Sequence, residues 1–418
     1  MQGEVRRLDP VGDGQLPADF WRLWAAGVVS RLGSGVASAA APLLAATLTR
    51  DPRQVALVTV AAGLPWLLFG LHTGALADRW ERRRVMWACD LVSAGIYAAL
   101  AAAVVAGQAT LWTLCAVAFA AATVSTLFDS ASQAALPSIV PRGQLARANS
   151  RMYVGTVMAG LFAGPPLGSW LFSAVDGLPF ALDAASFVGS AALVSSIRAR
   201  FHAAARGRTS LRHDIGAGIR WLWAHRQLRA VVVLLTVWNL TESAVVGVLV
   251  LYALEELGLD ASTYGVLLTG VAVGGIVGAT AAPRLERRLG TGVVIAVTVG
   301  ATVLADVGLA LTRHPGVAVG LLALVGAAAF AFNVVSVSYR QSVVPDGLQG
   351  RVSSTYRFAT WGINPVGAGL GGVIAQAAGI PAVFWSAAAV LALVAVGVLP
   401  VLTNGRLAAG RAAADVGD

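Results

Sequence analysis

The chain has 418 residues, of which 57% are hydrophobic and only 12% are charged, and its mean hydropathy is +0.73. A soluble domain carries about 25% charged residues, so this composition cannot cover a water-exposed surface, and the chain needs lipid as its solvent. The formal charge of +9 includes 30 basic residues, all of them arginine, which lie in short segments between apolar runs. That distribution argues against nucleic acid as a partner and is typical of the loops of membrane proteins.

Twelve segments are long and apolar enough to cross the hydrocarbon layer, which needs about 20 apolar residues per helix. They lie at residues 21–48, 54–77, 85–106, 109–136, 149–175, 179–197, 228–253, 263–284, 291–312, 315–341, 354–377 and 380–402. None of them alternates apolar and polar residues over a long stretch, and helices then remain the way to satisfy the backbone in lipid. The sequence therefore predicts an all-α integral membrane protein with twelve transmembrane helices.

The arginines also predict how the chain is oriented and divided. They gather in every second loop, so the positive-inside rule places both termini in the cytoplasm. The segment 198–227 separates six helices from six, and its apolar residues recur at the spacing of an amphipathic helix. In chain order we expect a cytoplasmic N-terminal segment 1–20, a six-helix bundle 21–197, a cytoplasmic amphipathic linker 198–227, a second six-helix bundle 228–402 and a cytoplasmic tail 403–418. The polar start of the chain lacks the pattern of a signal peptide.

The densest charge cluster of the first half is GALADRWERRR at residues 74–84, between two apolar runs. It resembles motif A of the major facilitator superfamily, G-x-L-A-D-R-x-G-R-R-x-L, and departs from it at Glu81, where that family has glycine. The resemblance implies a gate that joins the two halves at the cytoplasmic face, made by Gly74, Asp78, Arg79 and Arg83. A weaker copy of the motif occupies residues 278–288.

An internal repeat supports two similar halves. Phe128-Asp129 followed by Val140-Pro141 recurs 204 residues later as Phe332-Asn333 followed by Val344-Pro345. Several residue types keep this one register, which is the organisation of the same superfamily, whose substrates bind near mid-membrane between the halves.

The stretch GLFAGPPLGS at residues 160–169 combines glycines four residues apart with a proline pair. Such glycines allow two helices to approach closely, and prolines remove backbone hydrogen bonds and bend the helix. The stretch resembles motif C of the family, G-x-x-x-G-P-x-x-G-G, which is typical of exporters that exchange a drug for a proton. The residues that carry this resemblance are Gly160, Gly164, Pro165 and Gly168, and an ordinary packing helix is the alternative.

Six ionisable residues fall inside apolar runs, where charge is costly and commonly marks function. They are Arg31, Asp90, Asp129, Asp183, Glu242 and Asp306. Glu242 and Asp306 lie deepest, and Glu242 is our first candidate for binding a proton or another cation. Arg31 and Asp129 are further candidates for coupling or substrate contact, with structural ion pairing as the alternative. Motif B of the family would place an arginine in the fourth helix, and residues 109–136 contain none.

The sequence shows no constellation for catalysis. It contains no Gly-x-x-x-x-Gly-Lys-Ser/Thr loop, its five histidines have no metal-ligand spacing, and its two cysteines lie in apolar runs. We therefore expect no enzyme, no metal site and no cofactor, and an ion gradient rather than ATP as the energy source.

The start of the first helix, the 144–149 loop and the linker resemble one branch of the superfamily, which contains macrolide-efflux and enterobactin-exporter-like proteins. This resemblance implies proton-driven efflux of a drug-like or secondary-metabolite small molecule, macrolide- or siderophore-like, by alternating access. We expect a multi-pass monomer in the bacterial cytoplasmic membrane, with the lipid bilayer and its substrate as partners. An importer or facilitator of the same fold and a non-transporting receptor or assembly protein are the alternatives.

Overall fold

The computed structural model describes residues 15–69, 81–198, 219–345 and 348–415 of the chain. These residues form helices joined by short loops, and no strand occurs among them, which confirms the predicted all-α class. Helices satisfy their own backbone hydrogen bonds, as a lipid environment demands.

The first half of the chain runs from α1 to α8. Its helices are α1 (Ala18–Leu48), α2 (Pro52–Phe69), α4 (Arg82–Val105), α5 (Leu111–Ile139), the short turn η1 (Arg142–Gln144), α6 (Leu145–Val157), the π-helical turn η2 (Met158–Ala163), α7 (Gly164–Ala174) and α8 (Leu178–Ser195).

The second half runs from α10 to α17. Its helices are α10 (Arg226–Leu251), the π-helical turn η3 (Tyr252–Glu256), α11 (Ala261–Leu289), α12 (Thr291–Leu311), α13 (Pro315–Val343), α14 (Gln349–Trp361), α15 (Asn364–Ala378), α16 (Ile380–Val398), the short turn η5 (Leu399–Val401) and α17 (Asn404–Asp415). Of the predicted linker, residues 219–224 are helical, and its residues 199–218 lie outside the described part of the chain.

Eleven helices or continuous helix pairs among the described residues are long and apolar enough to cross a membrane. The twelfth passage is made by α14 and α15, which are separated at Gly362 and Ile363. Pro365 stands in the first turn of α15, where its missing N–H cannot continue the helix from α14. This broken pair completes the twelve transmembrane helices that the sequence predicts.

The repeat seen in the sequence is also a repeat of helix boundaries. α5 and α13 both contain 29 residues and begin at Leu111 and Pro315, a spacing of 204 residues (315 − 111). α6 and α14 begin at Leu145 and Gln349, which is the same spacing (349 − 145). The two halves are therefore built on one helical plan.

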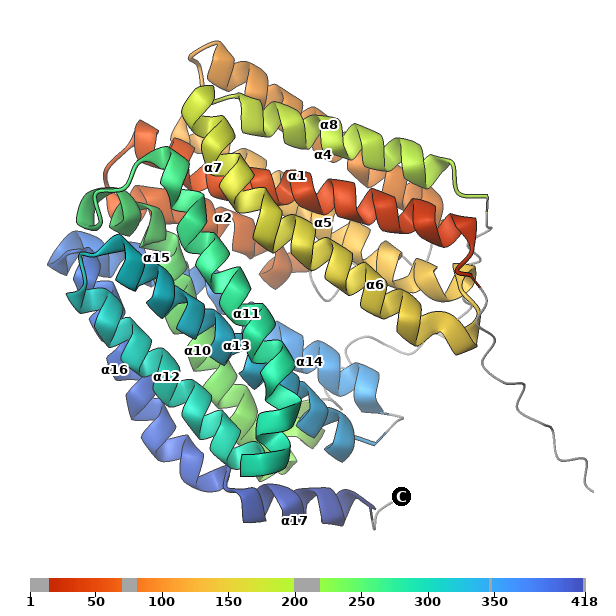
Figure 1. Ribbon diagram of the computed structural model, residues 1–418, viewed down its shortest axis with the longest axis vertical. Helices are drawn as coiled ribbons and strands as arrows, with labels where there is room; N and C mark the ends of the chain where they lie inside the picture. Colours follow the sequence, from red (N-terminus) through yellow and green to blue (C-terminus); the bar gives the residue numbers. More distant parts are fainter. Residues whose placement is uncertain (1–14, 70–80, 199–218, 346–347, 416–418) are drawn as a thin grey trace, which may run out of the picture.

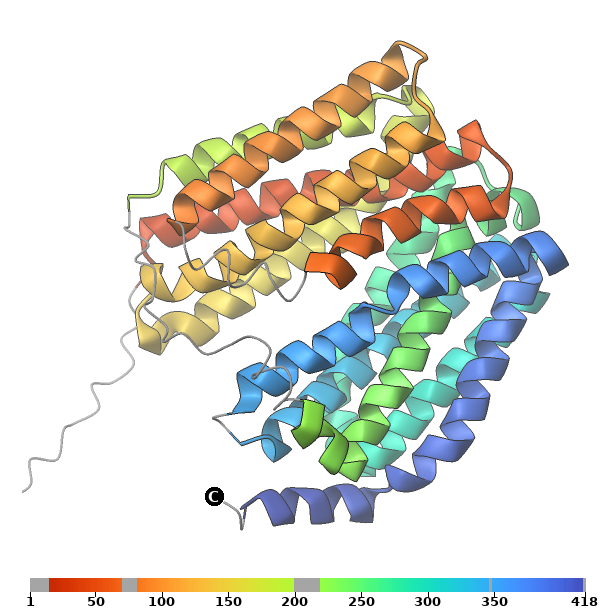
Figure 2. The same ribbon diagram turned by 180° about the vertical axis from the view of Figure 1, so that it is seen from behind.

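The two halves form helical bundles that meet at one end of the molecule and diverge toward the other (Figures 1 and 2). We call the end where they meet the closed end; it carries the α1–α2 loop and the η3–α11 loop (residues 49–51 and 257–260). We call the other end the terminal end; α1 begins there and α17 lies there.

Helices from both halves pack against each other toward the closed end, α2 against α15 and α7 against α11. At the second contact, Gly265 of α11 lies against the backbone of Pro165 and Pro166, and a Cβ at position 265 would come within 2.6 Å of the Pro166 Cα. Only glycine permits this approach. A cluster of buried apolar side chains that includes Leu43 of α1 and Val248 of α10 joins the halves in the same region.

Two further contacts connect the halves. Arg50 Nη1 lies 3.6 Å from Glu255 Oε1 across the closed end. Deeper in the molecule, the rings of Trp66 and Trp361 meet edge to face with centroids 5.3 Å apart. Because these contacts and the packed helix pairs hold the halves together on one side, the bundles are free to diverge on the other.

The last described helix, α17, crosses the terminal end of the second bundle (Figure 1). Asn404, at the start of α17, donates from Nδ2 to the Leu289 carbonyl (2.7 Å) and accepts from the Gly292 N–H (2.7 Å). Near its other end, Arg411 Nη2 lies 3.1 Å from Glu286 Oε1. These contacts hold residues 278–288, the weaker copy of the 74–84 motif, and the start of α12 against the predicted tail.

Candidate functional site

An interior cavity of about 480 Å³ lies among the helices of the first bundle and reaches α10 and α11 of the second. The polar and charged side chains that line it come from α1, α2, α4, α5 and α11 and are those of Ser30, Arg31, Ser34, Ser38, Thr59, Asp90, Ser93, Tyr97, Ser125, Asp129 and Tyr264. Most of the remaining wall is apolar or aromatic and includes Phe128, Phe180, Phe187, Val246 and Leu249. A mostly apolar wall with a few convergent polar groups is the usual form of a small-molecule site.

The cavity arises from small residues repeated along single helix faces. On α1 the lining residues Ser30, Ser34, Ser38 and Ala41 follow one another at spacings of three or four, so they share one face of the helix. These side chains are too short to fill the space between α1 and its neighbours. The face therefore leaves a void with hydroxyl groups at its edge.

Arg31 and Asp129, both predicted candidates, meet at this cavity. Arg31 Nη2 of α1 lies 2.6 Å from Asp129 Oδ1 of α5, and the side chains are 47% and 20% exposed. The family resemblance would have placed an arginine on the fourth helix; here that helix supplies the carboxylate and the first helix supplies the arginine. A charge pair in the membrane interior is stable only while both partners are present, because either one alone would be an uncompensated charge.

Two more carboxyl groups lie in the first bundle. Asp90 lines the cavity, is 1% exposed, and accepts a hydrogen bond from the Ser190 hydroxyl to its Oδ2 at 2.7 Å. Asp183 is fully buried and accepts a bond from Ser186 at 3.2 Å, whereas its Oδ2 has no hydrogen-bond partner among the described residues. Asp90 is thus both part of the site and bound to α8, while Asp183 lies behind the cavity wall.

The structure places Glu242 and Asp306 in the second bundle, outside the residues that line the cavity. Glu242 is half-buried on α10, and Asp306 is 2% exposed on α12. The two carboxyl groups lie close enough for electrostatic interaction. The neighbouring Asn239 is already bound, since its Nδ2 donates to the Thr360 carbonyl at 2.8 Å.

The glycine–proline stretch contacts two helices at once. A Cβ at Gly164 would lie 2.6 Å from the Gly35 Cα, so α1 and α7 touch through their backbones. Gly160 and Gly168 face the same side of α1, whereas the proline pair faces α11. The expected irregularity is the turn η2, in which the Gly164 N–H donates to the carbonyl of Ala159, five residues earlier.

The charge cluster at residues 74–84 is described only in part. Gly74, Asp78 and Arg79 lie outside the described residues. Arg83 donates from Nη1 to the Ile197 carbonyl just after α8 (2.7 Å), and its Nη2 lies 3.5 Å from Glu81 Oε1. A cation at the C-terminal end of a helix is favoured by the helix dipole, so Arg83 ties the start of α4 to the end of α8.

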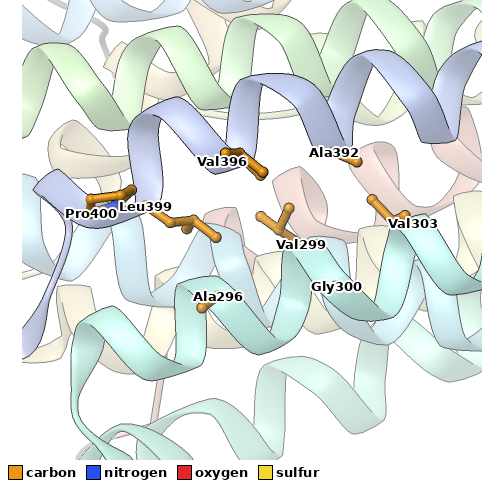
Figure 3. A pocket seen from close by; sticks show the side chains of 9 residues that line it. Ala296, Val299, Gly300, Val303, Ala392, Val396, Leu399 and Pro400 are labelled. Atoms are coloured by element: carbon orange, nitrogen blue, oxygen red, sulfur yellow. The ribbon is translucent and has the colours of Figure 1, made fainter.

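A second hollow of about 410 Å³ lies between α12 and α16 and is lined only by apolar residues, among them Val299, Val303 and Val396 (Figure 3). Val396 is 76% exposed on the surface of the bundle. The hollow offers no polar group to orient a substrate, and its composition matches a surface that faces lipid acyl chains. We therefore assign the substrate site to the first cavity.

Sequence reasoning missed the serines of α1 and α4 and the two tyrosines that line the cavity. Their signal was the spacing of Ser30, Ser34 and Ser38 within an apolar run, which marks a polar face of a helix. Among the described residues, no three His, Cys, Asp or Glu side chains gather as a metal site.

Twelve membrane-crossing helices in two repeated bundles, with an interior cavity reaching from one bundle to the other, define a membrane transporter of the major facilitator type. A family model described as transmembrane secretion effector matches residues 17–413. The chain belongs to this family of transporters.

Relatives and solved structures agree with that assignment. The chain is similar to the multidrug efflux pump Tap of Mycolicibacterium fortuitum, with 27% identity over 382 residues, covering 86% of this chain and 90% of the relative. Its fold is similar to that of the nucleoside transporter NupG (D323A mutant), with a TM-score of 0.78 at 12% identity, covering 92% of this chain and 100% of the other. It is also similar to a bacterial homologue of the iron transporter ferroportin in its inward-facing state, with a TM-score of 0.74 at 17% identity, covering 93% and 99%.

Proposed function

We propose that the protein is a proton-driven exporter of drug-like or secondary-metabolite small molecules that works by alternating access. The observation that carries this proposal is the cavity of about 480 Å³ with the Arg31–Asp129 ion pair in its wall. The volume lies within the range of about 300–1,000 Å³ that small-molecule pockets occupy. Aromatic and apolar walls suit a partly apolar compound of the macrolide- or siderophore-like kind.

Alternating access requires two bundles that close on one side of the membrane while they part on the other. The packing of α2 on α15 and of α7 on α11 closes one end, and the bundles diverge toward the terminal end (Figure 2). With both termini in the cytoplasm, as the arginine distribution favours, the cavity in this state takes its substrate from the cytoplasm. Export then requires the closed-end contacts to separate.

Proton coupling needs a carboxylate that gains a proton in one state and loses it in the other. Asp129 suits this role because its Oδ1 is held by Arg31 in the wall of the cavity. A proton on Asp129 replaces the ion pair by a neutral acid and frees Arg31, which then changes what the cavity can bind. A cationic substrate that pairs with the Asp129 carboxylate and a proton that neutralises the same carboxylate then exclude each other from one site.

Two observations favour export over uptake. The stretch 160–169 resembles the motif of drug–proton exchangers, and its glycines and prolines contact both α1 and α11, which are the helices that must move apart. A relative that aligns with 86% of this chain is named a multidrug efflux pump.

The test is the accumulation of macrolides, cationic dyes and siderophores in efflux-deficient bacteria with and without a protonophore. Cells express the wild type, Asp129→Asn, or the matched control Asp176→Asn, which makes the same change at an exposed position in the α7–α8 loop. We expect lower accumulation of at least one compound with the wild type and the control. Asp129→Asn and the protonophore each abolish that difference.

Other outcomes identify the alternatives. Higher accumulation with the wild type indicates an importer, and efflux that survives the protonophore contradicts proton coupling. If well-inserted wild type changes no compound in the panel, the exporter proposal fails, and a narrow substrate or a receptor role takes its place.

A further inference from the structure

We propose that the cavity of the first bundle selects organic cations, and that Asp90 is the residue that binds their positive charge. The inference rests on the proposed transport function of this cavity and names its class of substrate. That class is apolar compounds with one positive charge, such as a protonated or quaternary amine. Anionic compounds, including acidic siderophores, fall outside it.

The charges of the cavity wall do not balance. Among the described residues that line the cavity, Asp90 and Asp129 are acidic and Arg31 alone is basic. Arg31 is already paired, since its Nη2 lies 2.6 Å from Asp129 Oδ1. The other arginine of α1, Arg22, pairs with Asp19 at 2.6 Å and does not line the cavity. With both carboxyl groups ionised, one negative charge is left over, and it belongs to Asp90.

The helices around Asp90 bring no other base to it. α5 and α8 pack on α4, and neither contains an arginine or a histidine. The arginines of α4 stand in its first turn, at residues 82–84, about 9–12 Å along the helix axis from Asp90. Two of them, Arg83 and Arg84, lie 3.5 Å and 2.8 Å from oxygens of Glu81. The compensating charge is therefore left to a ligand.

The Asp90 carboxyl is held in place with one oxygen unused. Asp90 is 1% exposed, and the Ser190 hydroxyl of α8 donates to its Oδ2 at 2.7 Å. Among the described residues this is the one hydrogen bond that the carboxyl accepts, so Oδ1 remains for a ligand. An ionised carboxyl without a cationic partner is costly away from water, and a bound cation removes that cost.

The surroundings of Asp90 favour an organic cation over a metal ion. Ser93 and Tyr97 follow Asp90 at spacings of three and seven residues, so all three share the face of α4 that lines the cavity. The ring of Tyr97 stacks on Phe187 of α8 with centroids 5.9 Å apart, and both rings belong to the wall. Aromatic faces attract alkylated cations, whereas hard metal ions need several oxygen ligands. The apolar remainder of the wall suits the rest of such a molecule.

The same charge balance links the cation to the proton. A proton on Asp129 changes the net charge of the ionisable groups in the wall from one negative to zero. Protonation there weakens the attraction for a cation at Asp90, although the two carboxyl groups come from different helices, α4 and α5. Substrate and proton can thus oppose each other through the field of the cavity as a whole.

The experiment compares two probes of nearly the same size and shape but opposite charge, radiolabelled tetraphenylphosphonium and tetraphenylborate. Equilibrium binding to the purified full-length protein in detergent is measured at pH 8, after subtraction of binding to empty micelles. We expect the wild type to bind the cation. Asp90→Asn lowers its affinity about tenfold or more, as loss of a charged partner does, and does not lower that for tetraphenylborate. The control Asp176→Asn, at an exposed loop position, changes neither.

A second measurement needs no variant. Dicyclohexylcarbodiimide, an apolar reagent, modifies buried carboxyl groups, and mass spectrometry identifies which residue has reacted. We expect tetraphenylphosphonium to protect Asp90 of the wild type from this reagent and tetraphenylborate not to do so. If Asp90→Asn loses both probes, its cavity is damaged, and protection in the wild type decides.

The proposal is overturned if Asp90→Asn binds the cation as tightly as the wild type, or if the cation neither binds the wild type nor protects Asp90. These results are independent of transport. Cation binding that depends on Asp90 in a protein without efflux activity would contradict the exporter and leave the site standing. Efflux without such binding would do the reverse.

Discussion

Arg50 and Glu255 face each other across the two bundles, with Arg50 Nη1 3.6 Å from Glu255 Oε1. Arg50 stands in the loop between α1 and α2, and Glu255 lies in η3 before α11. Both side chains are largely exposed, at 62% and 41%. The pair therefore stabilises the closed end only weakly. Separating the bundles at this end costs little free energy at this contact.

We predict that Glu255→Gln increases opening of the closed end by up to about fivefold, because an exposed ion pair contributes about 1 kcal/mol or less. The measurement is labelling of a cysteine at Ser38, a residue of the cavity wall, by a membrane-impermeant maleimide in cells. All variants for this measurement are made in a protein whose two native cysteines, Cys89 and Cys115, have been replaced.

Glu256→Gln is the matched control for that variant. It breaks the 3.3 Å pair between Glu256 and Arg313, which lies within the second bundle. Labelling equal in both variants would show that the Arg50–Glu255 pair does not hold the bundles together.

We predict that Gly164→Ala destabilises the protein by about 1–3 kcal/mol, because inserting a methyl group into a tight contact is an overpacking change. The new Cβ would lie 2.6 Å from the Gly35 Cα, where neither backbone can yield. Thermal unfolding in detergent measures the change. Gly95→Ala of α4 is the control, since no atom lies within 4 Å of the Cβ it would add, and it should be neutral or slightly stabilising.

We predict that Arg31 and Asp129 couple strongly in a double-mutant cycle. Arg31→Gln leaves the Asp129 carboxylate without its 2.6 Å partner, and Asp129→Asn does the same to Arg31. Each single variant should lose about 1–3 kcal/mol of stability, the cost of a polar group left unsatisfied. The double variant should lose less than the sum by about 1 kcal/mol or more. Additive losses would mean that the pair contributes no direct interaction.

We predict that the contribution of Asp51 to stability disappears in acid. The hydrogen bond from the Arg53 side chain lowers the pKa of the Asp51 carboxyl below its ordinary value of 3.8. A carboxyl whose pKa is lowered by folding stabilises the protein above the unfolded pKa, and this stabilisation is lost as the pH falls through the folded pKa. The wild type should therefore melt above Asp51→Asn at pH 7, and the two should converge as the pH falls below the ordinary value. A difference that persists at the acid end contradicts this prediction.

The helices and their repeat could be predicted from the sequence because both depend on local patterns. Apolar runs of sufficient length must be helical in lipid. The 204-residue spacing of the repeat identifies α5 and α13 as equivalent helices without any knowledge of their contacts. The glycines at 160, 164 and 168 likewise indicated a close helix contact through their spacing alone.

The partners across that contact could not be predicted. Arg31 and Asp129 are 98 residues apart in the chain, and their pairing depends on how α1 and α5 are rotated about their axes. Several intramembrane carboxyl groups were equally available to Arg31 in the sequence. The cavity was missed for the same reason, since an empty space is defined only by helices that have already packed.

The two bundles repeat one arrangement of helices but differ in how their interiors are packed. The first bundle places Asp129 at a cavity wall, and the equivalent position of the second bundle holds Asn333. Its neighbour Phe332 packs on Trp238, with ring centroids 5.0 Å apart, in a filled core. Equivalent positions of the two bundles thus line a cavity in the first and belong to a packed core in the second. We expect the second bundle to move as a more rigid unit around this core, while changes of shape during a cycle concentrate around the cavity of the first.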